Sequence, residues 1–447
     1  MTRALPLIAA LVLCVVAVLV ARCRAARAAR SLAASCVACL AAIYVVAQLL
    51  APHVAPELVA LGDGSAVADQ GWQASVPVIQ LVVALLVVSF APVATHAPRT
   101  LGVILASFAF SLALVACDDA LLIALFWSAG TVVVGWEVRR LDRVCGSDCA
   151  RPFFLYQGLA LIALVVGTVA FALGAAGLGA IAWLLAIAIR EAALPLHGWL
   201  PAIADRVPLG LLVAFLAPQP GVYAQLVVLQ DITGGRLAEA FAIVAASTSV
   251  AAAGIGLVQV SARRAAVWLV ISQTALIAFG LENVSVVGRA GAILAWHVMA
   301  LATSGFLMTL AAIEARRGAL SLVAASGCFA RTPRMATAFL LLGLASVSLP
   351  LTLGFAAEDL LVQGTVQSYP VLGLAVIVAT ALNGIQVLRC FFALFTGTHV
   401  HSGEMDLNRR EFAAMTVVLG ILLFGGMAPR LFVPTPAVQN VPALRSH

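Results

Sequence analysis

The 447-residue sequence contains no lysine, so every one of its 25 basic side chains is an arginine. Charged residues of all kinds make up only 10% of the chain, whereas 63% of the residues are hydrophobic and the mean hydropathy is +1.11. This composition excludes a soluble globular domain of this size and indicates an integral membrane protein. The net charge of +6 requires no nucleic-acid partner, because arginines in short loops are what orients a membrane protein.

The sequence also lacks the patterns that hold metals and cofactors. Its nine cysteines form no framework, since Cys145 and Cys149 share a short loop without a second ligand pair. His399 and His401 lie near acidic residues in a polar loop, where we expect a solvated turn. No glycine-rich phosphate loop follows a strand. We therefore expect this chain to bind no metal and no cofactor, so that any redox chemistry belongs to a partner.

Long apolar runs dominate what is present. About 20 apolar residues cross the hydrocarbon core of a bilayer, and the sequence predicts an all-α membrane protein with about 14 transmembrane helices. The expected spans are 4-21, 31-51, 75-95, 101-117, 120-138, 153-175, 178-200, 208-230, 237-260, 264-281, 290-313, 335-361, 370-396 and 411-428.

Two of these spans contain both prolines and ionisable residues, near 186-205 and 348-360. The first reads AIAIREAALPLHGWLPAIAD and carries Arg190 ahead of Pro195, and the second carries Glu358 after Pro350. Proline opens a helix, and a bilayer tolerates the freed carbonyls only where protein or water satisfies them. An ionised side chain at that depth avoids lipid. Broken helices in comparable places predict a transporter fold with two inverted-repeat halves.

The distribution of arginine predicts the orientation of the protein, because cytoplasmic loops carry the excess of basic residues. Most of the arginines fall in loops that alternate along the chain, which places both termini on the outer side. The arginines expected on the inner side are Arg22, Arg24, Arg27, Arg30, Arg99, Arg139, Arg140, Arg143, Arg151, Arg206, Arg263, Arg264, Arg316, Arg317, Arg331, Arg334, Arg409 and Arg410.

Several motifs resemble one family. Arg190 is followed by Pro-Leu-His-Gly-Trp-Leu-Pro at 195-201, a segment from Arg263 runs to Ser-Gln at 272-273, and Asp-Leu-Asn-Arg-Arg-Glu at 406-411 opens the last span. These runs are similar to those of the antiporter-like, proton-conducting membrane subunits of respiratory complex I, the NADH-quinone oxidoreductase, and nearest to its M-type (chain 4-like) subunit. The resemblance covers roughly residues 118-432.

The resemblance implies a division of the chain into four parts. N-terminal transmembrane helices occupy 1-117, a first antiporter-like half 118-230, a second half with the C-terminal helices 237-432, and a tail 433-447.

In that family, lysines, glutamates and histidines at mid-membrane are thought to relay protons. The resemblance carries this role to Glu358 and His297, with His197 and Arg190 as supporting elements. The family's glutamate of the fifth helix falls at Ser128, its seventh-helix lysine at Arg190, and its eighth-helix lysine at Gln219. None of these three replacements releases a proton at physiological pH, since arginine stays charged where a buried lysine titrates.

Other readings of these residues stay open. Arg190 is either a fixed charge that tunes its neighbours or a structural fork for carbonyls freed by Pro195. Glu191 adjoins Arg190, but neighbouring residues on a helix do not face each other. Glu137 lies nine residues beyond Ser128, about 13 Å along a helix, and we expect it to form a surface ion pair with the arginines beside it.

The expected function is proton translocation as a subunit of a complex I-like NADH-quinone oxidoreductase or a related energy-converting complex. The chain is not expected to catalyse redox chemistry itself; NADH, flavin, iron-sulfur clusters or quinone would belong to partner subunits. It would lie in the inner (cytoplasmic) membrane as a multi-pass protein among other membrane subunits. The alternatives are a membrane subunit of an inorganic-carbon uptake complex, or a non-conducting scaffold that has lost the lysine relay.

Overall fold

The computed structural model describes residues 4-54, 71-92, 95-146, 148, 150-230, 235-325, 327, 329-397 and 405-432. The loop with His399 and His401 and the tail at 433-447 lie outside these ranges. In the described part of the chain the fold is entirely helical, apart from one isolated bridge between Ser261 and Ser321. The predicted all-α class is therefore confirmed.

The described residues form the following helices, in chain order. They are α1 (Ala4–Arg22), α2 (Ala26–Val54), α5 (Gly71–Phe90), α6 (Pro98–Leu114), α7 (Ala120–Cys145), α8 (Ala150–Ala172), α9 (Ala176–Arg190), α10 (Trp199–Ala204), α11 (Leu209–Leu216), α12 (Pro220–Val227), α13 (Arg236–Leu257), α14 (Ala262–Leu281), α15 (Val286–Val298), the π-helix η2 (Met299–Thr303), α16 (Ser304–Arg317), α17 (Pro333–Ala345), α18 (Leu353–Ser368), α19 (Pro370–Phe395), α20 (Arg409–Met427) and the 3₁₀-helix η3 (Pro429–Leu431).

Among the described residues, 11 helices are long and apolar enough to cross a membrane, and α15, η2 and α16 count together as one of them. Three shorter apolar helices, α6, α9 and α17, overlap predicted spans. The multi-pass fold is thus confirmed, but the exact number of 14 spans is not.

Local sequence signals set several helix boundaries. The Asp119 side chain accepts hydrogen bonds from the backbone N–H groups of Leu121 (2.9 Å) and Leu122 (3.1 Å), which caps α7. That helix ends at Gly146, whose φ of 62° is left-handed. At the start of α20, Asn408 and Glu411 form a reciprocal capping box.

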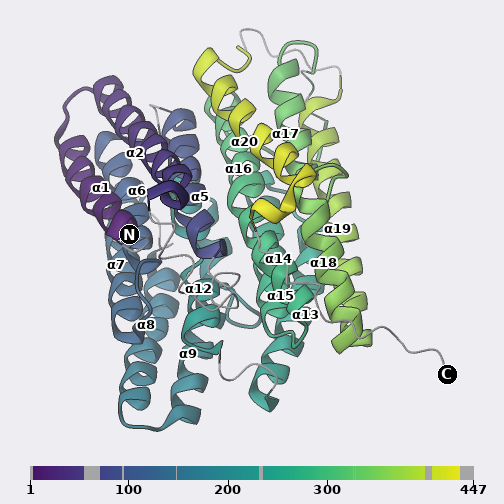
Figure 1. Cartoon of the computed structure of the whole chain (residues 1–447). Coiled ribbons are helices and arrows are strands. Elements are labelled where there is room, and N and C mark those ends of the chain that lie inside the picture. The colour runs from purple at the N-terminus through teal and green to yellow at the C-terminus, as the bar shows by residue number, and fades with distance from the viewer. Residues whose placement is uncertain are drawn as a thin grey trace.

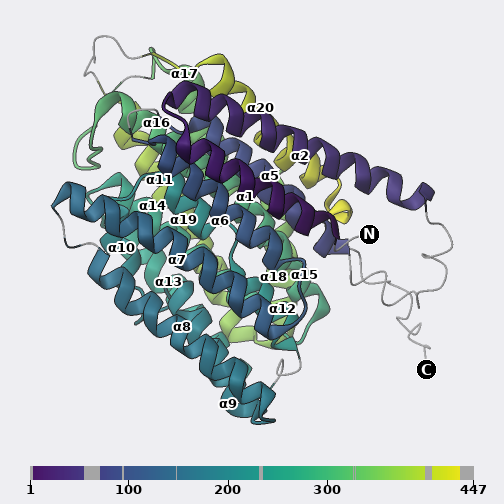
Figure 2. The same cartoon turned by 90° about the vertical axis from the view of Figure 1, so that its left-hand side faces the viewer.

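Helices α1 to α9 and helices α13 to α19 form opposite sides of one bundle, and α20 packs against both α5 and α18 (Figure 1). On the first side, α1 packs along α6 and α2. Helices α6 and α2 also pack against α5 (Figure 2). On the second side, α13 packs against α14 and α19, and α15 packs against α18. Helix α14 is buried along almost its whole length, so it forms the centre of the second side.

Three interruptions divide membrane-length segments in the described part of the chain. The first lies between α9 and α10 and the third between α17 and α18, both where proline predicted them. The second lies between α11 and α12 and was not predicted. Each contains non-glycine residues with positive φ: Ala192 (57°), Gln219 (43°), Ser348 (71°) and Leu351 (69°). Such backbone is unfavourable for L residues and persists only where its surroundings hold it.

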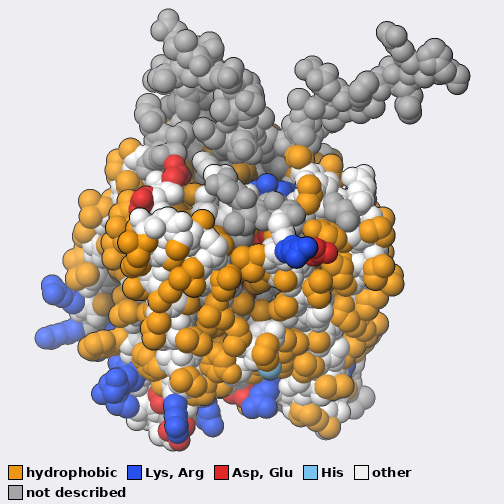
Figure 3. All heavy atoms as spheres, turned by 90° about the horizontal axis from the view of Figure 1, so that it is seen from below, with side chains coloured by type: hydrophobic (Ala, Val, Ile, Leu, Met, Phe, Trp, Pro, Cys, Tyr) orange, Lys and Arg blue, Asp and Glu red, His pale blue; other side chains and the backbone are white. Residues whose placement is uncertain are grey.

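Arginine-rich loops meet at one end of the bundle. Arg263 donates to the carbonyls of Ala204 (3.0 Å) and Val207 (2.9 Å), and Arg264 binds the carboxylate of Asp205 at 2.7 Å. Figure 3 shows a mostly hydrophobic face with arginine side chains gathered toward one edge. Loops expected on the same side of the membrane therefore do lie together, while the side that they face stays a prediction.

Helices α15 and α18 pack backbone to backbone. A Cβ atom at Gly291 would overlap the backbone of Leu361, and one at Gly364 would overlap the backbone of Gly288. Small residues at such crossings let membrane helices approach closely. This contact fixes the position of α18, which carries Glu358.

We predict that Gly291→Ala destabilises the protein by about 1–3 kcal/mol, because the added methyl group forces the two backbones apart. The matched control is Gly384→Ala in α19, where a Cβ meets nothing within 4 Å. Thermal unfolding of the purified complex measures both variants. Equal melting temperatures for the two would contradict the backbone contact.

Candidate functional site

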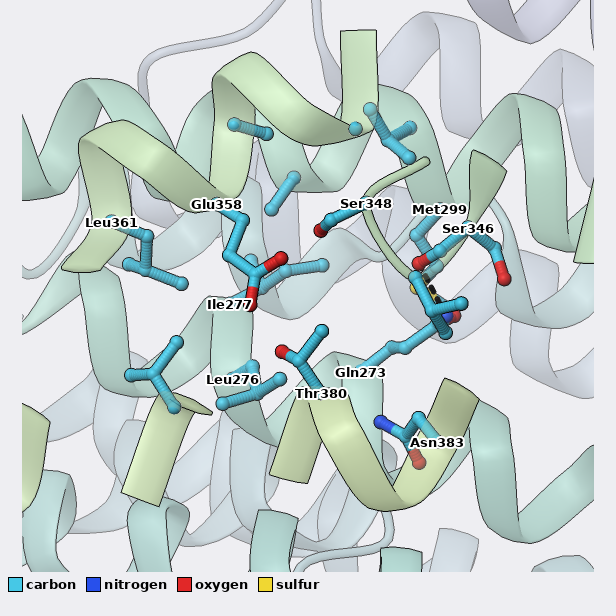
Figure 4. A pocket seen from close by; sticks show the side chains of 16 residues that line it. Gln273, Leu276, Ile277, Met299, Ser346, Ser348, Glu358, Leu361, Thr380 and Asn383 are labelled. Atoms are coloured by element: carbon cyan, nitrogen blue, oxygen red, sulfur yellow. Dashed lines mark hydrogen bonds between the residues drawn. The ribbon is translucent and has the colours of Figure 1, made fainter. Parts of the chain in front are cut away.

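Glu358 lies at the third interruption and points into an internal cavity. The cavity has a volume of about 50 Å³, which is room enough for water. In Figure 4 the carboxyl group of Glu358 faces the hydroxyls of Ser348 and Thr380 across this space. Asp359, the next residue, is exposed instead and accepts a hydrogen bond from Gln363 at 2.9 Å. Of the two adjacent acids, Glu358 is thus the one built into the protein interior.

Helix α14 connects this cavity to the third interruption. Gln273 lines the cavity, donates to the carbonyl of Ser346 at 2.8 Å and accepts from the Thr303 hydroxyl at 2.6 Å. Its neighbour Ser272 accepts a hydrogen bond from Asn383, which also lines the cavity, at 2.9 Å. The motif at 272-273 in the sequence therefore supplies the polar wall beside Glu358.

The same helix also reaches the first interruption. The hydroxyl of Thr274 donates to its own helix and also to the backbone carbonyl of Glu191 at 3.3 Å. Three consecutive polar residues of α14 thus face different neighbours, and together they join the two predicted breaks. Because all three are buried, these hydrogen bonds form away from the lipid-facing surface.

Arg190 is buried at the end of α9 and connects two interruptions. It donates a hydrogen bond to the carbonyl of Phe215, and its guanidinium lies 3.3 Å from the centroid of the Phe215 ring. That carbonyl would accept from Gln219 in an unbroken helix. At the first break it is Trp199, not Arg190, that donates to a backbone carbonyl: its indole N–H binds Ile189 O at 2.8 Å. The structural fork exists, but it satisfies a different carbonyl from the one expected.

The family carboxylate position at Ser128 holds no titratable group, and its hydroxyl donates to Ala124 O within α7 at 2.7 Å. The face of α7 formed by Trp127 and Thr131 instead lines a cavity of about 30 Å³ beside Arg190. The side chain of Glu137 does not replace the missing carboxylate there, because it pairs with Arg140.

The expectation of a surface ion pair at Glu137 was wrong in one respect. The pair with Arg140 exists, but the Glu137 side chain is fully buried. Arg140 donates to it at 2.9 Å through Nε, and the Thr100 hydroxyl donates at 2.7 Å. Burial of an arginine-neutralised carboxylate anchors α7 to α6, which is a structural role.

The two candidate histidines lie in different places. His297 is buried, with Nε2 2.7 Å from the Ser75 hydroxyl and Nδ1 2.6 Å from Ile293 O, and it lines a small cavity between α5 and η2. It precedes the π-helix, a feature often found at functional sites. His197 is half-buried between α9 and α10, and its ring lies 5.1 Å from Trp268. His297 and Glu358 line separate cavities, so the structure does not bring them together.

Gln219, the eighth-helix family position, lies inside the unpredicted interruption. Its amide N–H contacts the Met299 sulfur at 2.7 Å, and Met299 lines the Glu358 cavity. Pro218 and Pro220 flank Gln219, and they are the sequence signal that this second break offered.

A larger cavity of about 830 Å³ opens at the arginine-rich end of the bundle. Its lining includes Asp205, Arg264 and Glu314, together with His96. Burial lowers the pKa of His96, in the loop before α6, to about 4, so its imidazole is neutral at physiological pH. This cavity gives water access to the start of α14.

Interrupted apolar helices with ionisable side chains at the breaks, Arg190 and His197 at the first and Glu358 at the third, are the features expected of an antiporter-like membrane subunit. The chain belongs to the transmembrane family described as NADH:quinone oxidoreductase/Mrp antiporter, whose model matches residues 149–383, more than half of the sequence. NADH-quinone oxidoreductase subunit M from two strains of Mycobacterium tuberculosis is 28% identical over 174 residues, or 38% of this chain. The match covers only 32% of the length of those relatives.

Solved structures agree on the fold. A chain of respiratory complex I from Thermus thermophilus with bound NADH matches with a TM-score of 0.81 at 20% identity, covering 96% of both chains. A chain of the Mrp complex from Dietzia sp. DQ12-45-1b gives 0.81 at 17% identity, covering 97% of this chain and 96% of that one. The archaeal membrane-bound sulfane sulfur reductase gives 0.74 at 18%, covering 80% and 65%. These likenesses show that the fold is shared.

We predict that Arg190→Met destabilises the protein by about 1–3 kcal/mol, since it leaves the buried Phe215 carbonyl without its donor. Arg190→Lys, which keeps a donor, is expected to lose less. Arg236→Met, at the exposed start of α13, is the control. Melting temperatures of the purified complexes decide the matter, and an Arg190→Met protein as stable as the parent would contradict the structural fork.

Proposed function

We propose that this chain is a proton-translocating membrane subunit of a complex I-like NADH-quinone oxidoreductase or a related energy-converting complex. The observation that carries the proposal is the position of Glu358, in a cavity with room for water at a helix break, with polar side chains of α14 leading away from it. A carboxyl at membrane depth is costly and is kept where it functions.

Protons cross a bilayer by moving between titratable groups and ordered water. Glu358 can hold a proton in its neutral form and release it to water in the cavity. The hydroxyls of Ser348 and Thr380 face its carboxyl group, and a hydroxyl can hydrogen-bond to a neutral carboxyl or to a carboxylate. Arg190 takes no part in the transfer, because a guanidinium keeps its proton. Its fixed positive charge stabilises anionic carboxyls nearby.

The proposal extends to the setting of the chain. Other membrane subunits would pack against its exposed apolar helices, and NADH, flavin, iron-sulfur clusters or quinone would be held by partner subunits. The arginine-rich end would lie on the cytoplasmic side of the inner membrane, and both termini would lie on its outer side.

A non-conducting scaffold is the second candidate function. Ser128 and Gln219 favour it, since each stands where the family carries a titratable group and neither titrates. The Ser128 hydroxyl is bonded within its own helix and the Gln219 amide contacts Met299. A scaffold would retain the fold and the breaks but carry no proton flux.

We predict that Glu358→Gln lowers proton flux per turnover of the complex at least tenfold, because the amide keeps the size of the side chain but cannot release a proton. The measurement uses the complete native complex in sealed vesicles, with the partner's reaction monitored in parallel. Asp359→Asn, which changes the exposed neighbouring acid, is the control and should retain flux. Intact flux in an assembled Glu358→Gln complex would favour the scaffold.

A further inference from the structure

Glu191 is a buried acid with no partner for one of its oxygens. It is 7% exposed and follows Arg190 at the end of α9, and its Oε1 has no hydrogen-bond partner among the described residues. That oxygen lies against Gly221 of α12, 2.6 Å from where a Cβ would stand. The glycine therefore leaves the space that the carboxyl group occupies.

A second buried acid, Glu282, contacts α12 one helical turn farther along that helix, at Gln225. Gln225 is four residues from Gly221, on the same face of the helix and about 6 Å along its axis. Its amide donates to Oε1 of Glu282 at 2.9 Å, and Glu282 is only 3% exposed. The two carboxyl groups interact electrostatically, as do Glu191 and Arg190. Carboxyl, amide and carboxyl thus follow the α12 surface toward the end of α14.

We propose that Glu191 and Glu282 form a proton route from the first helix break to the end of the bundle opposite the arginine-rich loops. This route takes the place of the titratable pair lost at Ser128 and Arg190. The inference rests on the proposed proton translocation and adds the residues that carry it beside the first helix break.

The transfer is a proton movement with no change in oxidation state. The O–H bond of neutral Glu191 breaks, its proton passes through water, and an O–H bond forms on ionised Glu282. Arg190 stabilises the carboxylate left on Glu191, and the Gln225 amide holds Glu282 in place. Glu282, just beyond the end of α14, then releases the proton at the membrane boundary.

The charges around Glu282 suit this role. Burial raises its pKa to about 7, while the hydrogen bond from Gln225 and the positive charge of Arg289 oppose the rise. Tyr369, between α18 and α19, and Glu191 are the other titratable groups that interact with it. Because its pKa is near 7, Glu282 is populated in both protonation states at neutral pH, as a relay group requires.

The first experiment replaces each acid by its amide in the native complex. Glu191→Gln and Glu282→Gln should each lower proton flux per turnover at least tenfold in sealed vesicles, with assembly checked by co-purification. Glu282→Asp, which keeps a titratable group, should recover part of the flux. Glu239→Gln, an exposed acid in the first turn of α13, is the control and should leave flux unchanged.

A second experiment displaces Glu191 without removing a titratable group. Gly221→Ala puts a methyl group where the Glu191 oxygen lies and should lower flux severalfold. Gly254→Ala in α13, where a Cβ meets nothing within 4 Å, is the matched control. Equal flux in the two glycine variants would overturn the placement of Glu191 on the route.

Infrared titration distinguishes a titrating Glu282 from one that is only structural. A protonated-carboxyl band with a midpoint near pH 7 should be present in the parent and absent from Glu282→Gln. If Glu358→Gln stops flux but both Glu191→Gln and Glu282→Gln conduct fully, this route is wrong and the proposed function stands. If the parent itself moves no protons, both are overturned.

Discussion

The structure depends on one constraint, which is that each backbone carbonyl freed inside the bilayer must find a donor within the protein. At the first break the Thr274 hydroxyl donates to the Glu191 carbonyl that Pro195 leaves free, and the Trp199 indole donates to the Ile189 carbonyl. At the second break the donor is Arg190, and at the third it is the Gln273 amide. Each donor belongs either to a different helix or to the segment on the far side of the break. The breaks are therefore held by tertiary contacts, and the cavities beside them follow from that arrangement.

The absence of lysine changes the chemistry that such a bundle can perform. A buried lysine can lose its proton near neutral pH, whereas a buried arginine remains a fixed charge. Arg190 has accordingly become a structural and electrostatic element, bonded to Phe215 and adjacent to Glu191. The groups that we propose to titrate are all carboxyls: Glu191 and Glu282 on the route that starts at the first break, and Glu358 in the cavity at the third break.

Much of the fold could be predicted from the sequence, because span length and proline positions follow from local physical chemistry. Apolar runs located the helices, and Pro195 and Pro350 located two breaks. The second break does not show in the hydropathy pattern, because the segment around Gln219 is apolar throughout; its only sequence signal is the pair Pro218 and Pro220. The burial of Glu137 and the Glu282–Gln225 contact could not be predicted, since both depend on helices distant in sequence. The resemblance placed Glu358 and His297 as one relay, but the two line separate cavities.

Carboxyls alone, in our proposal, conduct protons through this chain. The most direct measurement is the ratio of protons moved to partner turnovers in vesicles, comparing the native complex with one in which Glu191, Glu282 and Glu358 are all replaced by glutamine. If carboxyls carry the protons, the triple variant assembles and its ratio falls at least tenfold, as in each single variant. An unchanged ratio in the assembled triple variant would contradict the claim.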